Sequence, residues 1–144
     1  PYFYMITPSS INLNKTKNTL TVSFEGVDYP LSSEFLRVYS PSSEVQGHKP
    51  EDAVLQLNKE NVLIQNVRPM GNYAVVLHFD DGHDTGIYSW SYLHHLATRQ
   101  GQLWNEYLEK VSQRLSSKWV LIHSFTFEIM TKNVLDSLSG ATFC

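Results

Sequence analysis

The sequence predicts an α+β fold, in which two consecutive helices from the C-terminal half pack on a mainly antiparallel sheet. In residues 73–79, apolar side chains recur at every second position, and this period is typical of a β-strand. In residues 103–115, apolar side chains recur at spacings of three and four, which is typical of an amphipathic helix. The strand patterns precede the helical patterns along the chain.

The first strands are predicted from short alternating segments. Residues 11–13 and then residues 19–24 alternate apolar with polar side chains, as half-buried strands do. Glu25-Gly26 predicts a turn, and a further strand is expected near residues 28–30. These segments together form a predicted hairpin.

A short helical turn and a loop are expected next. Residues 31–37 offer a serine cap, an acidic residue and an apolar pair, which predict one turn of helix. Residues 39–50 are rich in Ser, Pro and Gly, and these residues favour a loop over any regular element.

A second group of strands follows. Residues 62–67 and 73–79 predict adjacent strands, and the apolar Ala74 and Val76 on the second face of the latter indicate a central strand that is covered on both sides. Asp81-Gly82 predicts a tight turn into a third strand at residues 85–88.

Two helices are predicted after these strands. Ser89 or Ser91 can cap the first helix, which carries apolar residues at helical spacing between positions 90 and 97. In the second helix, the apolar stripe of residues 103–115 is expected to face the core.

The tail is predicted separately from the domain. We expect a domain at residues 1–117 and an unassigned tail at residues 118–144 that packs as a strand or helix or serves as an oligomerisation segment. Within the tail, residues 119–129 resemble strand material and residues 134–138 resemble a short helix. The only cysteine is Cys144, so the chain forms no internal disulfide.

Composition excludes several classes of function. A chain of 144 residues with 42% hydrophobic and 17% charged residues fits one soluble domain, and its net charge of −3 argues against nucleic acid as a partner. No apolar run approaches the roughly 20 residues that span a membrane, and the start lacks the pattern of a signal peptide. We therefore expect a cytoplasmic protein that does not bind membranes.

Catalytic motifs are also missing from the sequence. Ser89 lies in no Gly-x-Ser-x-Gly elbow, and the terminal Cys144 is a poor candidate for a nucleophile. An iron oxygenase site often begins as His-x-Asp or His-x-Glu, whereas in His83-Asp84 the carboxylate directly follows the histidine. We expect no catalysis by this chain alone.

Two segments together carry a family resemblance. They read Leu-Arg-Val-Tyr-Ser-Pro-Ser-Ser-Glu-Val-Gln-Gly-His at residues 36–48 and Asp-Asp-Gly-His-Asp-Thr-Gly-Ile-Tyr-Ser-Trp at residues 80–90. With Leu-Trp-Asn-Glu-Tyr-Leu at residues 103–108, they resemble the gamma-butyrobetaine hydroxylase-like N-terminal domain family, in its small stand-alone bacterial-type form. The resemblance runs from about residue 8 to residue 115 and implies a compact α+β domain with a mainly antiparallel sheet.

The resemblance also implies where a zinc site would lie. In the hydroxylases, three cysteines and one histidine hold a structural zinc ion; their positions fall here on Ser40, Ser42, Val45 and His83. Neutral hydroxyls are poor zinc ligands and valine offers none, so we expect this zinc site to be absent. Hydrogen bonds should replace it, with Ser40 and Ser42 capping backbone groups and His83 donating to a loop carbonyl.

A different metal site is the alternative. If the 39–50 loop folds over the hairpin, His83, His48 and Glu44 converge as two nitrogen ligands and one oxygen ligand, suited to zinc or iron. Such a site would support an oxidoreductase. The simpler interpretation of His83 is a turn residue whose ring is hydrogen-bonded.

The function that we expect is that of a non-catalytic accessory or adaptor domain without a cofactor. In related proteins the domain precedes an iron-dependent oxygenase or joins an ATPase that carries an iron–sulfur cluster, so an oxygenase or an iron–sulfur carrier is the expected partner. The expected contact surface comprises residues 40–48, residues 81–84 and exposed aromatics near Tyr88 and Tyr92. A homodimer formed through the tail is a further expectation.

Overall fold

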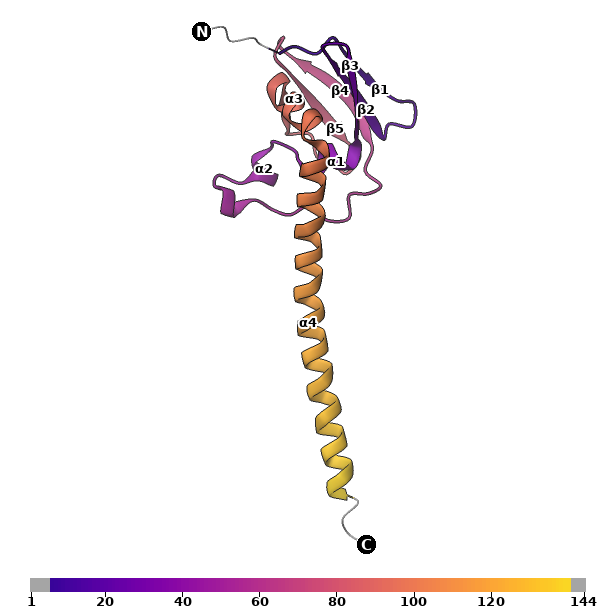
Figure 1. Ribbon diagram of the computed structural model, residues 1–144, viewed down its shortest axis with the longest axis vertical. Coiled ribbons are helices and arrows are strands. Elements are labelled where there is room, and N and C mark those ends of the chain that lie inside the picture. Colours follow the sequence, from indigo (N-terminus) through magenta and orange to yellow (C-terminus); the bar gives the residue numbers. More distant parts are fainter. Residues whose placement is uncertain (1–5, 141–144) are drawn as a thin grey trace. The chain divides into compact units, whose positions relative to one another are not determined.

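The computed structural model describes residues 6–140, in two units (Figure 1). Within that range the side chains at positions 120, 122–128, 131 and 133–140 are not described, and Cys144 lies outside it. The two units are Pro1–Glu106 and Tyr107–Cys144.

The first sheet contains the first three strands in sequence order. β1 (Ser10–Leu13), β2 (Thr19–Phe24) and β3 (Val27–Ser32) are antiparallel neighbours. Glu25 and Gly26 join β2 to β3 with φ angles of 51° and 80°, and two consecutive positive φ angles match the twist of a hairpin. The predicted hairpin is confirmed.

Three short helical segments follow the first sheet. α1 (Ser33–Val38) begins after Ser32, whose hydroxyl accepts a hydrogen bond from the Phe35 backbone at 3.0 Å. α2 (Ser43–Gln46) and the 3-10 turn η1 (Pro50–Asp52) lie in the long connection to the second sheet.

The second sheet is also antiparallel, in the order β4 (Ile64–Met70), β5 (Ala74–Phe79) and β6 (Ile87–Ser89). β5 is the central strand, and all its residues are buried except the half-buried His78. This confirms the strand that the sequence placed at the centre. The predicted α+β class with antiparallel strands is confirmed, with the strands divided between two sheets.

Two helices complete the described chain. α3 (Trp90–Thr98) is capped by Ser89, whose hydroxyl accepts from the Tyr92 backbone at 3.2 Å, and α4 spans Gln100–Gly140. In the first unit, α3 packs on β2, β3 and β6. The buried core draws on both sheets, α1 and α3, and its most enclosed large side chains include Leu20, Leu31, Phe35, Ile64, Leu77, Tyr88, Leu93 and Leu96.

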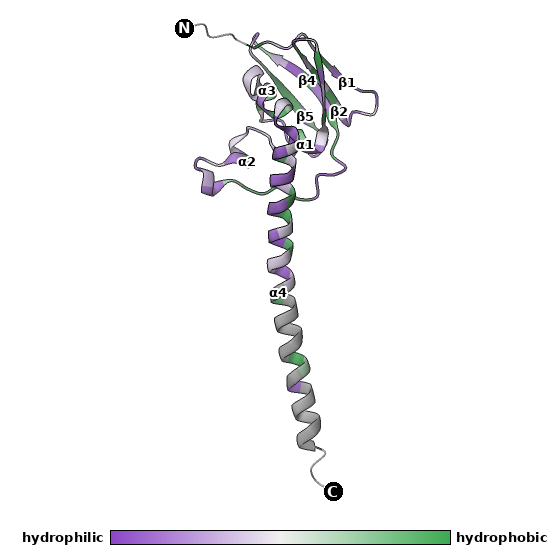
Figure 2. Cartoon of the chain, viewed as in Figure 1, coloured by the Kyte–Doolittle hydropathy of each residue, from purple (hydrophilic) through white to green (hydrophobic). Residues whose placement is uncertain are grey.

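The prediction of strands in the tail is wrong, because α4 continues as one helix to Gly140. Short apolar runs such as residues 119–122 fit a strand and a helix equally well by periodicity alone. Two residues of the expected apolar stripe, Leu108 and Leu115, are 47% and 51% exposed. Figure 2 shows hydrophobic and hydrophilic residues mixed along the described part of α4.

Among the helices described here, none combines the length and the apolar character that a bilayer span requires.

Candidate functional site

The centre of the candidate site is a buried hydrogen bond between Ser40 and His83. The Ser40 hydroxyl oxygen lies 2.7 Å from His83 Nε2, and the two residues are 0% and 6% exposed. Ser40 follows the end of α1, while His83 lies in the turn after β5, where Gly82 has a φ of 86° and donates to the Phe79 carbonyl at 3.1 Å. The contact therefore fastens the 39–50 loop to the second sheet.

The other ring nitrogen of His83 faces a carboxylate. Nδ1 lies 3.3 Å from a Glu44 side-chain oxygen, and that side chain is 64% exposed. The pKa of His83 lies below 6.5, mainly because the ring is buried and secondly because the Arg37 guanidinium is near. The Glu44 and Asp81 carboxylates raise the pKa but do not offset these two effects. The neutral ring that this favours carries its proton on Nδ1, because a carboxylate only accepts; Nε2 then accepts from Ser40.

Asp81 anchors the turn that carries His83. One carboxylate oxygen accepts from Arg37 Nε at 2.9 Å and from Lys59 Nζ at 2.7 Å, and the other accepts from the His83 backbone at 3.2 Å. Burial alone would raise the pKa of Asp81, but the hydrogen bonds from these three donors outweigh it and lower the pKa to about 2. Asp81 is thus charged and structural at neutral pH.

Ser42 organises the loop above this contact. Its hydroxyl accepts from the Glu44 backbone at 3.2 Å as the cap of α2 and lies 2.7 Å from the Thr85 hydroxyl. Its own backbone donates to the Ser40 hydroxyl at 3.3 Å. The predicted capping role of both serines is confirmed, whereas His83 contacts a hydroxyl and not a loop carbonyl.

Gly86 is required by the close approach of the loop. A β-carbon at this position would lie 2.5 Å from the Ser40 hydroxyl oxygen and 3.3 Å from Pro41 Cδ. Any larger side chain would push the loop away from the second sheet. Gly86 therefore belongs to the site. The sequence pointed to it only through its position within residues 80–90, one of the two segments that carry the family resemblance.

The structure brings three of the four positions that the resemblance implies for zinc into contact, but the four side chains do not suit zinc. Ser40 and His83 are in direct contact, Ser42 bonds to Ser40, and Val45 is buried in the same loop. Two neutral hydroxyls, one alkyl group and one hydrogen-bonded imidazole form no tetrahedral ligand set.

The alternative metal set is only partly assembled. Glu44 meets His83, but His48 is exposed. Among the side chains that the structure describes, no three from His, Cys, Asp and Glu are placed to hold one metal ion, so His48 does not join the pair. The expected aromatic contact residue Tyr88 is also absent from the surface: it is 0% exposed and its hydroxyl donates to the Leu36 carbonyl at 2.5 Å. Tyr92 is half-buried.

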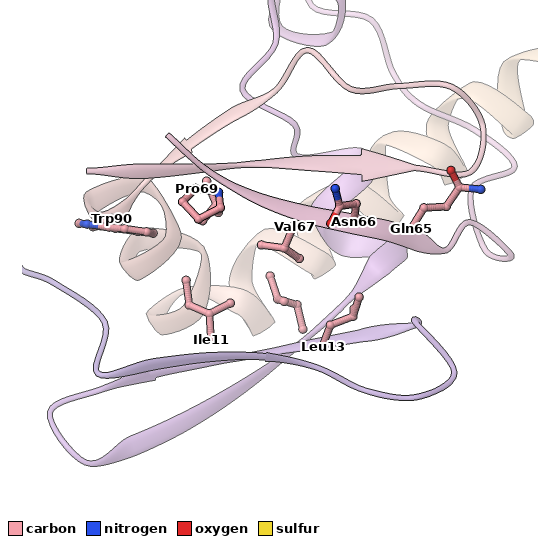
Figure 3. Close-up of a pocket in the computed structure, with 9 residues that line it drawn as sticks. Ile11, Leu13, Gln65, Asn66, Val67, Pro69 and Trp90 are labelled. Atoms are coloured by element: carbon pink, nitrogen blue, oxygen red, sulfur yellow. The ribbon is translucent and has the colours of Figure 1, made fainter. Parts of the chain in front are cut away.

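A second feature is an open groove between the two sheets, which the sequence did not reveal. It has a volume of about 560 Å³ and is lined by Ile11 and Leu13 of β1, Val67 and Pro69 of β4 and Trp90 at the start of α3 (Figure 3). Two features of the sequence are related to the groove. The residues of β1 alternate between exposed and half-buried, and β4 contains a proline, which is typical of a strand at the edge of a sheet.

Comparison with known families decides the assignment. The model described as gamma-butyrobetaine hydroxylase-like, N-terminal, matches residues 11–94, more than half of the chain. The chain belongs to this family. The match includes Ser40, Ser42, Val45 and His83, so the site described above lies within the family domain.

Three solved structures that are similar to this chain in sequence have the same fold. Two solution NMR structures are 51% and 46% identical to this chain, cover 75% and 78% of it and 86% and 84% of their own chains, and have TM-scores of 0.66 and 0.65. A crystal structure from Acidithiobacillus ferrooxidans, described as a protein with unknown function of the DUF971 family, is 34% identical. It covers 65% of this chain and 94% of its own, with a TM-score of 0.53. No curated protein matches the chain significantly.

Proposed function

We propose that the chain is a non-catalytic accessory domain that binds a protein partner through the exposed face of the 39–50 loop and the adjacent turn at residues 80–84. The observation that carries this proposal is the buried Ser40–His83 contact of 2.7 Å, which holds a polar loop against a rigid sheet. A loop already held in one arrangement loses less conformational entropy when a partner binds.

The chemistry of this surface supports recognition. Glu44, His48, Lys49 and Asp84 are exposed and carry groups of both signs, which can select a partner by charge complementarity. The histidine beneath them, His83, is buried with both ring nitrogens in contact with protein groups. Because both ring nitrogens of His83 contact groups of the protein, we assign this residue a structural role.

The partner class follows from the family resemblance. Larger relatives join this type of domain to an iron-dependent oxygenase, and other relatives join it to an ATPase that carries an iron–sulfur cluster. We therefore propose an oxygenase or an iron–sulfur carrier as the partner of the free-standing domain. The support for this step is associational, since the fold itself does not define a partner.

A charge reversal on the loop tests the proposal. Lys49→Glu should lower recovery of the partner in affinity purification at least tenfold, because it reverses an exposed charge on the proposed surface. Arg99→Glu makes the same charge change at an exposed position after α3 and should leave recovery unchanged. Equal recovery with both variants, or a captured protein that is neither an oxygenase nor an iron–sulfur carrier, would count against the proposal.

Metal binding is the second candidate function, and the 3.3 Å approach of Glu44 to His83 is the observation in its favour. Binding would require His48 to move from its exposed position into contact with the pair. Elemental analysis of tag-free protein after addition of zinc or iron(II) tests this: one metal ion per chain that is lost in both His83→Leu and His48→Leu would support it. Metal below one-tenth of the chain concentration would reject it.

A further inference from the structure

The groove between the sheets is bounded by the outer edges of β1 and β4, and the β4 edge is already bonded at one point, where Ile64 N donates to the Lys17 carbonyl at 2.9 Å. β1 is the first strand of one sheet and β4 is the first strand of the other, and no strand within residues 6–140 pairs with their outer edges. Figure 3 shows side chains of both sheets pointing into the space between them. An added strand could therefore pair its backbone and bury its side chains at the same place.

The hydrogen-bond pattern of β1 sets which backbone groups face outward. Asn14 N donates to Thr19 O at 3.1 Å, and the register places Asn12 opposite Thr21. In an antiparallel pair, hydrogen-bonded positions alternate, so Asn12 points its backbone groups toward β2. The N–H and C=O groups of Ile11 and Leu13 consequently point away from β2, toward the open edge.

β1 is the edge that suits an added strand. It contains neither a proline nor a charged side chain, and it has a regular register with β2. β4 carries Pro69 and Arg68, and its register shifts between Ile64 and Asn66. Prolines, charges and irregular registers protect sheet edges from pairing, and β1 lacks them.

The ends of the groove differ in polarity. Trp90 and Pro69 lie at the Ile11 end, whereas Gln65 and Asn66 lie at the Leu13 end (Figure 3). Lys15 and Lys17 follow Leu13 in the β1–β2 turn, and both are exposed. Among the described residues, neither lysine forms a salt bridge. A ligand that extends past Leu13 would meet positive charge.

We propose that the groove binds an extended segment of a partner protein, which adds to β1 as a further strand. The segment has apolar side chains at alternate positions that fill the groove, and an acidic residue beyond Leu13. This docking surface goes beyond the proposed function, because it uses β1 and β4 and not the 39–50 loop.

Hydrogen exchange on the full chain tests the pairing. The probe is the peptide acetyl-Ser-Val-Thr-Ile-Ser-Val-Glu-Glu-amide at about 1 mM, which detects weak binding. Residue-resolved NMR should show at least tenfold slower amide exchange at Ile11 and Leu13, and no change at Asn12, whose amide already faces β2. A peptide of the same composition with its apolar residues placed together should protect neither amide.

Charge exchange tests the acidic end without disturbing the core. Lys15→Glu should weaken binding of the probe at least threefold, and a probe that ends in Lys-Lys should bind this variant better than the natural chain. Leu13→Lys should abolish binding, while Asn12→Lys, on the opposite face of β1, should leave it intact. If the natural chain and Lys15→Glu bind the acidic probe with equal affinity, the segment has no acidic residue beyond Leu13. This comparison does not depend on whether Leu13→Lys folds.

Three outcomes would overturn the proposal as a whole. The first is unchanged exchange of Ile11 and Leu13 with the probe present. The second is slow exchange of both amides in the free protein that becomes faster on dilution, since the occupant would then be a second copy of the chain. The third is slow exchange that becomes faster when residues 1–5 are removed, since the occupant would then be the chain's own start.

Discussion

The Ser40 hydroxyl lies 2.7 Å from His83 Nε2, between two residues that are 43 positions apart in the sequence. The family resemblance implies that these two positions correspond to zinc ligands in the hydroxylases. Here a hydroxyl and an imidazole make a direct contact, so a hydrogen bond joins the loop to the turn after β5.

Replacing His83 should destabilise the first unit. His83→Leu keeps a side chain of moderate size but removes the nitrogen that accepts the proton of the buried Ser40 hydroxyl, so the free energy of unfolding should fall by roughly 1–3 kcal/mol. Urea denaturation followed by circular dichroism measures the change. His48→Leu is the matched control in the same loop, and because His48 is exposed it should change stability by less than about 0.5 kcal/mol. Equal effects would contradict a structural role of His83.

Stability should depend on pH in two separate ranges. The pKa of His83 is below 6.5 in the folded chain, so the unfolded chain binds its proton first, and stability that is complete above pH 6.5 is lost as the pH falls. The pKa of Asp81 is lowered from 3.8 to about 2, so a second loss occurs as the pH falls through that interval. The urea midpoint of each variant is measured as a function of pH. In His83→Leu the midpoint should depend less on pH in the range below 6.5, and in Asp81→Asn it should depend less on pH between 3.8 and about 2. A slope unchanged by either variant would contradict that assignment.

A β-carbon at Gly86 should disrupt the same contact. Gly86→Ala would place it 2.5 Å from the Ser40 hydroxyl oxygen, and the resulting overlap should destabilise the fold by roughly 1–3 kcal/mol in thermal denaturation. Gly101→Ala, where no atom lies within 4 Å of the added carbon, should be neutral or stabilising. In a Ser40→Ala background the cost of Gly86→Ala should decrease, and a cost that remains the same would show that the overlap lies elsewhere.

Restoring the three cysteines should restore a zinc site. The variant Ser40→Cys, Ser42→Cys, Val45→Cys supplies three thiolates in the loop that contacts His83, which provides the residues of a Cys₃His set. Elemental analysis should find one zinc ion per chain, and zinc should raise the thermal midpoint because it binds only the folded state. The variant with His83→Leu added is the control and should bind zinc more weakly. Failure of the cysteine variant to retain zinc would show that the loop geometry has diverged.

The homodimer expected from the sequence is tested on α4. Leu108, Leu115 and Ile129 are exposed and separated by multiples of seven residues, which places them on one stripe of the helix. If this stripe joins two chains through the tail, Ile129→Glu should lower the mass measured by light scattering from dimer to monomer, because burial of the carboxylate is unfavourable. Lys110→Glu, elsewhere on the helix, is the control. A monomeric mass for the unchanged chain would rule out the homodimer.

Local chemistry explains the elements that the sequence predicted correctly. Two apolar faces identified β5 as central, and the Glu25-Gly26 pair identified the β2–β3 turn because few residues adopt positive φ angles readily. Ser89 caps α3, as expected of a hydroxyl before a helical pattern. Each of these signals is complete within a few neighbouring residues.

The errors concern features without a complete local signal. The apolar run after Lys118 was predicted as strand, but helical hydrogen bonding continues through it to Gly140. Tyr88 was expected near the contact surface because it lies beside polar loops, yet the core encloses its ring and the Leu36 carbonyl accepts a hydrogen bond from its hydroxyl. Leu36 is 52 positions away, and nothing near Tyr88 in the sequence indicates this partner.

The sequence by itself determined the family, the α+β class and the replacement of three cysteine positions by Ser40, Ser42 and Val45, because these depend on residue identity and short-range pattern. Only the tertiary structure decided that Ser40 contacts His83, that His48 stays apart, and that a groove opens between β1 and β4. These relationships arise when two sheets and a long loop pack together. The free energy of that packing depends on contacts between residues distant in the chain, which periodicity does not encode.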